Sequence, residues 1–335
     1  MVSQPKVTIW RFTDGNVGHD QQSSGLVGEV AERVAADIYT ISVQEKGSGL
    51  MGALRGRYQF QDTLPSPDLI IGAGHRTHIP MLFARAKRGG KIVVLMKPSF
   101  PMSWFDLCLV PEHDGVEVKG RDYVQLTQGV LNCMENSRAH DVTRGLFLIG
   151  GPCKHSAWSD DEVCRQVSKI CSGQPRVQYS LTNSRRTPEC FLQKMRAKAP
   201  ANLKIFSFRE TPTDWVSKQL TIAHQAWVSA DSVSMVYEAL TAGASVGIID
   251  VPLRANSRIA TGLTQLVSHK RVIPYSVWFS GENLPANPEP LAESQRCAGM
   301  VILRWLNHMP ALSADTTLSD GDTVPSAVSV LSKSA

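Results

Sequence analysis

The residues best suited to chemistry follow a short apolar run in the second half of the chain. The run QAWVSA leads into Asp231, Ser232 and Ser234, and Glu238 lies four residues further on. Hydroxyl and N–H groups at a helix N-terminus attract anions such as a diphosphate, and a carboxylate accepts hydrogen bonds from the paired hydroxyls of a ribose. A capped helix ending at Gly243 explains Asp231 but not Glu238. We therefore interpret Ser232, Ser234 and Glu238 as a nucleotide-binding set.

A glycine turn in the same half adds a second candidate for phosphate binding. The apolar run GLFLI ends at Gly150 and Gly151, and Lys154 follows shortly after. Glycine allows a backbone to approach a ligand closely, and the lysine adds a positive charge. The turn alone is a weak signal, but it follows a predicted strand in the same way as the first set.

A pair of arginines forms the third candidate. The run VQYSLTN leads into Ser184, Arg185 and Arg186, directly before the expected start of a helix near Pro188. Guanidinium groups match the oxygens of a phosphate. Adjacent arginines are common on solvated turns, but the position before a helix favours phosphate binding.

In the first half, the segment DGNVGHDQQ carries the candidate general base, His19. It follows the apolar run VTIWRF, and Asp14, Gly15 and Gly18 are expected to line the same cleft. Histidine titrates near neutrality, so it can accept a proton from an acceptor hydroxyl. A histidine that only caps a turn would give the same pattern, and the residues alone weigh both interpretations equally.

Two further clusters in this half also follow apolar runs. GAGHRTH places His75 and Arg76 where they could present a cation to a ligand, although a structural turn before a helix explains them as well. PEHD combines Glu112, His113 and Asp114, a mixture found in metal sites. One local triplet is too little to predict a metal, so we expect Glu112 and His113 to line the cleft or the domain boundary.

Short apolar runs alternate with amphipathic segments, for example a helix expected at residues 24–36, and this predicts parallel sheets covered by helices on both faces. The pattern fails at residues 133–144 and then restarts. We therefore predict two Rossmann-like domains, at residues 1–135 and 145–310, and a disordered tail at 313–335. Ligands of open α/β sheets bind outside the carboxyl ends of the strands, so the two sheets are expected to face a central cleft that closes on the ligand.

Composition restricts the classes of protein. Of 335 residues, 42% are hydrophobic, yet no apolar run reaches the roughly 20 residues of a membrane span, and no secretory or transit segment precedes the first strand. We expect a cytoplasmic protein. The net charge of +5 is dispersed, which favours an anionic ligand or contact with a membrane surface over nucleic acid. Seven cysteines without a CxxC pair predict neither a metal nor a disulfide framework.

Taken together, several motifs resemble those of the elongated-mitochondria (Elm-type) fission-factor family of plants and many bacteria. They are ADSVSMVYEA, SRRTP, LIGGP, DGxxGHxxQ and FDLxxxPEHD, spread over residues 7–310. Bacterial members are regarded as GT-B glycosyltransferases. The resemblance thus implies a GT-B-like α/β fold and, without a cofactor or metal ion, transfer of a sugar from a nucleotide-diphosphate sugar to a hydroxyl of a lipid-linked or glycan acceptor at the inner membrane face.

The stretch from Asp231 to Glu238 is also similar to the donor-site helix of the peptidoglycan N-acetylglucosaminyl transferase. That similarity implies that the serine turn binds the diphosphate and Glu238 binds the ribose, and it supports His19 as the base. One departure concerns the segment LMKPSFP, where many family members have Pro-Arg and this chain has Pro98 followed by Ser99. A role of that arginine is lost here or passes to Lys97.

Two other functions compete with a transferase. Plant members of the family act as adaptors at the mitochondrial surface, so a non-catalytic scaffold is the alternative from another class. A nucleoside-diphosphate-sugar epimerase predicts a GxGxxG fingerprint and a Tyr-xxx-Lys pair, and the sequence contains neither. The retained candidate nucleotide residues favour the transferase.

Overall fold

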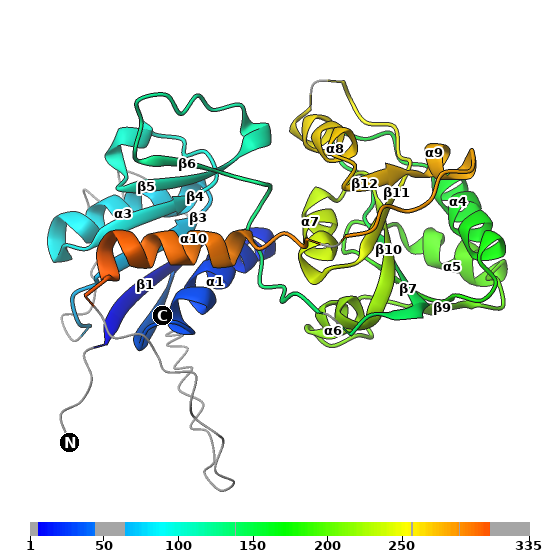
Figure 1. Ribbon diagram of the computed structural model, residues 1–335, viewed down its shortest axis with the longest axis horizontal. Helices are drawn as coiled ribbons and strands as arrows, with labels where there is room; N and C mark the ends of the chain where they lie inside the picture. Colours follow the sequence, from blue (N-terminus) through cyan, green and yellow to red (C-terminus); the bar gives the residue numbers. More distant parts are fainter. Residues whose placement is uncertain (1–5, 44–63, 138, 256, 288, 309–335) are drawn as a thin grey trace, which may run out of the picture. The chain divides into compact units, whose positions relative to one another are not determined.

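The computed structural model describes residues 6–43, 64–137, 139–255, 257–287 and 289–308. The chain forms two compact units (Figure 1). The first comprises Met1–Leu109, Val118–Gln125 and Ser294–Ala335, and the second comprises Val110–Glu117 and Leu126–Glu293. The tail predicted from residue 313 lies outside the described residues.

The first unit is built on a six-stranded sheet with the order β2-β1-β3-β4-β5-β6. Neighbouring strands from β2 to β5 pair in parallel. Its strands are β1 (Val7–Thr13), β2 (Ala36–Ser42), β3 (Leu69–Ala73), β4 (Lys91–Leu95), β5 (Leu107–Pro111) and β6 (Val124–Thr127). Its helices are α1 (Val17–Ala31), α3 (His75–Arg88), the short η1 (Met102–Trp104), and α10 (Glu293–Val301) with a π-helical turn at Ile302–Leu306. Every residue of β3 is buried, as expected for a central strand covered on both faces.

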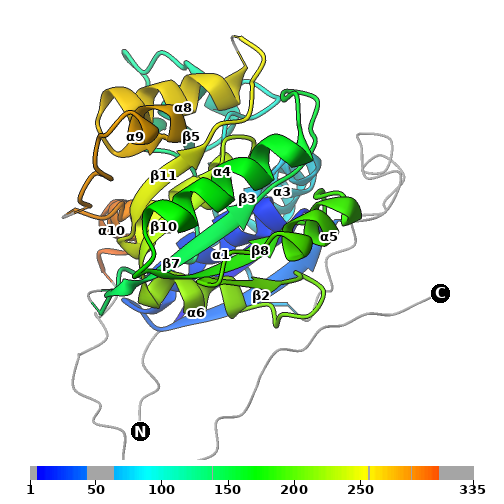
Figure 2. The same cartoon turned by 90° about the vertical axis from the view of Figure 1, so that its right-hand side faces the viewer.

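The second unit repeats this architecture with the strand order β12-β11-β10-β7-β8-β9, all neighbours being parallel. Its strands are β7 (Asp141–Ile149), β8 (Gln178–Asn183), β9 (Leu203–Phe206), β10 (Ala223–Ser229), β11 (Ser245–Ile249) and β12 (Val272–Pro274). Its helices are α4 (Asp160–Gly173), α5 (Glu189–Ala197), α6 (Trp215–Ile222), α7 (Val233–Ala242), α8 (Arg258–Ser268), α9 (Tyr275–Phe279) and the 3-10 turn η2 (Glu112–Asp114). Figure 2 shows α4 and α5 lying over the sheet.

The direction of strand order reverses between β7 and β10, because the chain leaves β7 toward β8 and leaves β10 toward β11. Loops that follow such strands diverge to opposite faces and open a crevice at the carboxyl ends. The switch point of the second sheet therefore lies between the turns after β7 and β10. These are the turns that carry Gly150 and Asp231.

The predicted α/β class with parallel sheets is confirmed. One predicted helix has wrong bounds: the helix expected at 24–36 is α1, which begins at Val17. The side chain of Asn16 accepts a hydrogen bond from the N–H of Gly18 at 3.0 Å and so starts the helix early. Gly18 and His19 consequently lie in the first turn of a helix and not in a loop.

The units are not the continuous ranges expected from the sequence. Residues from Ser294 group with the first unit, whereas the sequence analysis assigned 145–310 to one domain. The π-helical extension of α10 is tied to the segment before β6 in the first unit: Arg304 donates a hydrogen bond to the carbonyl of Asp122 at 2.9 Å. The sequence shows α10 as a helix but carries no sign of the unit it packs against.

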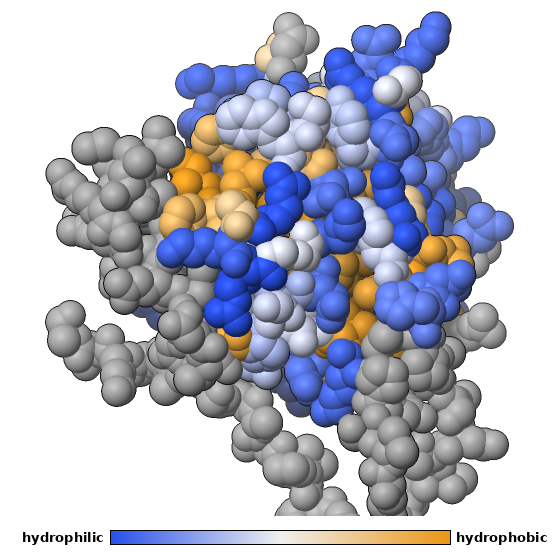
Figure 3. Space-filling view, turned by 90° about the vertical axis from the view of Figure 1, so that its left-hand side faces the viewer, coloured by the Kyte–Doolittle hydropathy of each residue, from blue (hydrophilic) through white to orange (hydrophobic). Residues whose placement is uncertain are grey.

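Hydrophobic side chains on one end of the molecule gather in separate patches between hydrophilic ones (Figure 3). Over the described residues, no helix has the length and hydropathy of a membrane-spanning segment. Peripheral contact with a membrane surface stays a prediction.

Candidate functional site

In the first unit, Asp14 and His19 form a hydrogen-bonded pair. The Nδ1 atom of His19 lies 2.9 Å from Oδ2 and 3.1 Å from Oδ1 of Asp14. The Asp14 side chain is 5% exposed and that of His19 is 23% exposed. A buried carboxylate thus holds one nitrogen of an imidazole that reaches solvent, and the structure brings these two predicted residues together.

Glycines keep the backbone close to this pair. A Cβ atom on Gly74 would overlap with the His19 ring and with the Asp14 carboxylate, and Gly74 has a φ of 90°, which also favours glycine. Gly15, with a φ of 74°, forms the turn after β1. The N–H of Gly18 donates to the side chain of Asn16, the N-cap residue of α1. The N–H groups of Gly15 and Gly18 bond to the side chains of Thr13 and Asn16, so these glycines shape the turn.

His75 and Arg76 begin helix α3, and both are exposed. The buried His78 lies one turn further on, between the rings of Phe100 and Phe105. The pKa of His78 is lowered to about 4, mainly by burial and to a lesser extent by charge repulsion from His75 and His19. His78 is therefore neutral at physiological pH and acts as a packed ring, while His75 and His19 remain at the surface.

Glu112 and His113 lie in η2, and the contacts of this turn are with the second unit. The His113 ring stacks on Tyr237 of α7 at 6.2 Å between centroids, and its buried Nδ1 has no partner among the described residues. Burial lowers the pKa of His113. The neighbouring Asp114 pairs with Arg258 of α8 at 3.4 Å. His113 thus packs against α7, and its predicted role in lining a cleft stays a prediction.

In the second unit, the turns after β7 and β10 interlock through the two predicted glycines. The N–H of Gly150 donates to Oγ of Ser229 at 2.7 Å, and the N–H of Gly151 donates to Oδ2 of Asp231 at 2.9 Å. A Cβ atom on Gly150 would overlap with the side chains of Asp231 and Ser232. The glycines were expected to let the backbone approach a phosphate, but their N–H groups bond within the protein and the glycines bring the two turns together.

The turn after β8 joins the same cluster through Ser184 and Thr187. The hydroxyls of both residues donate to the carbonyl of Gly150, and the N–H of Ser184 donates to Oγ1 of Thr187 at 2.9 Å. Ser184 is therefore a structural link between the β7 and β8 turns. Thr187, which the sequence groups with the arginine pair in the segment SRRTP, likewise bonds within the protein.

Arg186 and Arg185 differ in their surroundings, although they are adjacent. Arg186 donates to Oδ2 of Asp231 at 2.8 Å, to Oγ of Ser232 at 2.9 Å and to the carbonyl of Gly151 at 2.9 Å. Its side chain is still 42% exposed, whereas that of Asp231 is fully buried. Arg185 and Lys154 are exposed and have no ion pair among the described residues. The turns thus present two uncompensated cations.

Helix α7 begins beside this cluster without a side-chain cap. Ser232 occupies the N-cap position, but its hydroxyl is engaged with Asp231 and Arg186. The N–H groups of the first helical turn have no intrahelical acceptor, and Ser234 in this turn is exposed. Uncapped N–H groups and an exposed hydroxyl form a ready site for an anion.

Glu238 lies four residues after Ser234 on the same face of α7. It is 9% exposed and forms no ion pair or hydrogen bond with the described residues. Burial raises its pKa from the ordinary value near 4.5 to about 7. A carboxyl that is buried without a partner at the edge of an anion site is a candidate ligand-binding group.

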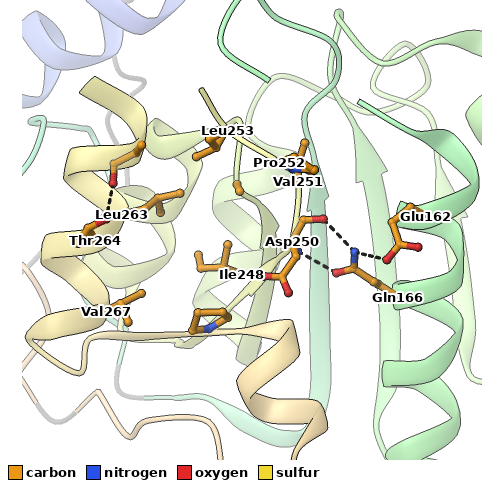
Figure 4. A pocket seen from close by; sticks show the side chains of 13 residues that line it. Glu162, Gln166, Ile248, Asp250, Val251, Pro252, Leu253, Leu263, Thr264 and Val267 are labelled. Carbon is orange, nitrogen blue, oxygen red and sulfur yellow. Dashed lines mark hydrogen bonds between the residues drawn. The ribbon is translucent and has the colours of Figure 1, made fainter. Parts of the chain in front are cut away.

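A pocket of about 620 Å³ lies next to this cluster and was missed by the sequence analysis (Figure 4). Ala230, the residue before Asp231, lines it, together with the loop after β11 and one face of α8. Most of its wall is apolar, and its polar groups bond to each other: Gln166 links Glu162 to the backbone of Asp250 at 2.8 to 3.1 Å. The sequence predicts no helix at residues 258–268, so the wall that α8 forms was not expected.

The loops after β7 and β11 are joined across the end of β10, which lies between these strands. Ser156 and Leu253 form an antiparallel bridge, and the N–H of Arg254 donates to the carbonyl of His155 at 2.8 Å. We call residues 155–157 and 252–254 the loop clasp. It fixes the two loops that flank the turn of Asp231. Across the described residues, no group of histidine, cysteine and carboxylate side chains could hold a metal ion.

Comparisons with known proteins fit this architecture. A family model described as "Mitochondrial fission ELM1" matches residues 17–305. The uncharacterized protein RP120 of Rickettsia prowazekii is 24% identical over 356 residues, which cover 88% of this chain and 98% of the relative.

Two solved structures share the fold. A Listeria monocytogenes protein described as a UDP-N-acetylglucosamine 2-epimerase has a TM-score of 0.60 at 10% identity and covers 91% of this chain and 97% of its own. MurG of Acinetobacter baumannii has a TM-score of 0.51 at 13% identity, with 90% of this chain and 100% of its own covered. Both are GT-B proteins, and at these identities the similarity confirms the GT-B-like fold alone.

Proposed function

The chain belongs to the mitochondrial fission ELM1 family, and from this premise we propose that it transfers a sugar from a nucleotide-diphosphate sugar to a hydroxyl of a lipid or glycan acceptor. One observation carries the proposal: the uncapped start of α7 meets the turns after β7 and β8 where the strand order reverses. Parallel α/β sheets bind nucleotides at such points.

The diphosphate of the donor would bind the first turn of α7. The N–H groups there, the hydroxyl of Ser234 and the exposed cations Arg185 and Lys154 provide hydrogen bonds and positive charge. The buried carboxylate of Asp231 would repel a phosphate if it were uncompensated. Its contacts with Arg186 and with the N–H of Gly151 offset that charge and leave the turn net positive.

Glu238 would accept hydrogen bonds from the two hydroxyls of the ribose. A carboxylate binds paired hydroxyls only in its charged form, because both oxygens must accept. A pKa of about 7 leaves Glu238 partly protonated near neutrality, so binding of the donor would draw it fully into the charged form.

His19 would act as the general base on the acceptor. The acceptor hydroxyl gives its proton to the imidazole, and its oxygen forms a bond to the anomeric carbon of the sugar. The bond from that carbon to the diphosphate breaks, and its electron pair stays on the phosphate oxygen. The N–H groups of α7 and the side chain of Arg185 would stabilise this developing charge.

The proposal is tested with a panel of UDP-, GDP-, CMP- and dTDP-sugars in thermal-shift and calorimetric assays. We expect one of them to raise the melting temperature, because a ligand that binds the native state stabilises it by mass action. Glu238→Gln should weaken this binding at least about tenfold. Glu189→Gln, at an exposed glutamate paired with Arg209, is the matched control. Absence of binding to every donor would overturn the proposal.

An epimerase remains the second enzymatic candidate, because the Listeria neighbour described as one shares this fold. The shared fold by itself does not separate the two activities. Incubation with the donor that binds does: an epimerase changes the sugar nucleotide without any acceptor, and a transferase needs the acceptor. A non-catalytic adaptor would retain its partner binding in Glu238→Gln.

A further inference from the structure

We infer that Asp14 is a positioning residue that fixes the tautomer of His19, an inference that rests on the proposed role of His19 as the base. Both carboxylate oxygens of Asp14 lie within 3.1 Å of Nδ1. A carboxylate can only accept, so Nδ1 must carry the hydrogen. The lone pair of the neutral imidazole then resides on Nε2, which makes no hydrogen bond to the described residues.

The surroundings hold Asp14 in this geometry. Its Oδ1 also accepts the N–H of Asn16 at 3.1 Å, which ties the carboxylate to the turn before α1. Gly74 closes the other side, where any larger residue would displace the pair. The Asp14 side chain is 5% exposed, so water competes little for its oxygens. A buried, doubly anchored carboxylate therefore restricts both the rotation and the tautomer of the ring.

The pair has a defined task in the proposed reaction. A base must present its lone pair to the proton it removes. With the hydrogen held on Nδ1, the acceptor proton moves to Nε2, and the resulting imidazolium is stabilised by the adjacent carboxylate. The logic is that of the Ser-His-Asp triad, in which the aspartate orients the imidazole and does not take up the proton.

The test uses Asp14→Asn in the full-length chain. Asparagine keeps the oxygen that accepts from Asn16 but can turn an NH₂ group toward Nδ1, which makes Nδ1 an acceptor and moves the hydrogen to Nε2. Nitrogen-15 NMR of the imidazoles reports the tautomer directly, and His19→Gln identifies the signal. We expect Nδ1–H in the wild type and Nε2–H in Asp14→Asn. The matched control Asp20→Asn changes the carboxylate next to His19, which bonds to Thr13, and should leave the tautomer as in the wild type.

An unchanged tautomer in Asp14→Asn, or Nε2–H in the wild type, overturns the inference. If Asp14→Asn fails to fold, Gly74→Ala provides the second variant, because its methyl group displaces the pair while both side chains remain. With a donor identified as above, kcat should fall at least about 100-fold in Asp14→Asn while binding of the donor is retained. The NMR result does not require any donor, so a failure of the proposed function and a failure of this inference are distinguished.

Discussion

The carboxyl of Glu238 makes stability depend on pH. Its pKa is near 4.5 in the unfolded chain and about 7 in the folded protein. Between these values the folded state holds a proton that the unfolded state releases, so the free energy of unfolding falls as pH rises through this window, by roughly 3 kcal/mol in total. The stabilisation is complete below pH 4.5 and lost above pH 7.

Denaturant unfolding at several pH values checks this expectation. Glu238→Gln should flatten the dependence between pH 4.5 and 7, and Glu189→Gln should reproduce the wild-type slope. Donor affinity should change in the opposite direction, increasing from pH 6 to pH 8 as Glu238 ionises. A wild-type slope that survives in Glu238→Gln would assign the dependence to another group.

Arg185 and Arg186 are expected to separate ligand binding from stability. Arg186→Ala leaves the buried Asp231 with fewer partners and should cost about 1–3 kcal/mol of stability. Arg185→Ala removes an exposed, unpaired side chain, so stability should stay within about 0.5 kcal/mol while donor affinity falls about tenfold. Urea unfolding and calorimetry measure the two effects, and equal stability losses in both variants would contradict the assignment.

At the scale of elements, the close approach of the β7 and β10 turns depends on Gly150. Gly150→Ala places a methyl group against Asp231 and Ser232 and should destabilise the second unit by about 1–3 kcal/mol. Gly262→Ala in α8 is the control in the same unit, because its Cβ would meet only His113 at ordinary contact distance. A helix gains about 0.5–1 kcal/mol from that change. Urea unfolding followed by circular dichroism compares the two, and equal effects would show that the turns can separate without cost.

The sequence predicts a strand well where a short, continuously apolar run is followed directly by a turn. Strands β3, β7 and β8 precede the predicted turns of His75, Gly150 and Ser184, and they are buried along most of their length. Strand β2 and helix α8 were missed for opposite reasons. β2 lies at the edge of its sheet and alternates between half-buried and exposed residues, whereas α8 follows a loop whose pairing partner is about 100 residues away.

At the scale of the whole molecule, the sequence predicts which polar residues lie in the turns of the second unit. It does not predict the hydrogen bonds that these turns make with one another. Polar residues after strands mark the carboxyl edge, so Asp231, Ser232 and Arg186 were found. What the sequence does not contain is the pairing between turns. The N–H groups of Gly150 and Gly151 bond to Ser229 and Asp231 because strand order places β7 next to β10. Only the fold decides which groups remain available to a ligand.

The loop clasp has a consequence for synthesis of the chain. Ser156 and Leu253 meet across the end of β10, so the turn of Asp231 is enclosed only after Leu253 has left the ribosome. A nascent chain that ends before β11 contains every predicted phosphate-binding residue but lacks the strand and loop that secure them. Completion of this turn is therefore a late event in the synthesis of the chain, because the strands before β11 emerge before the loop clasp can form.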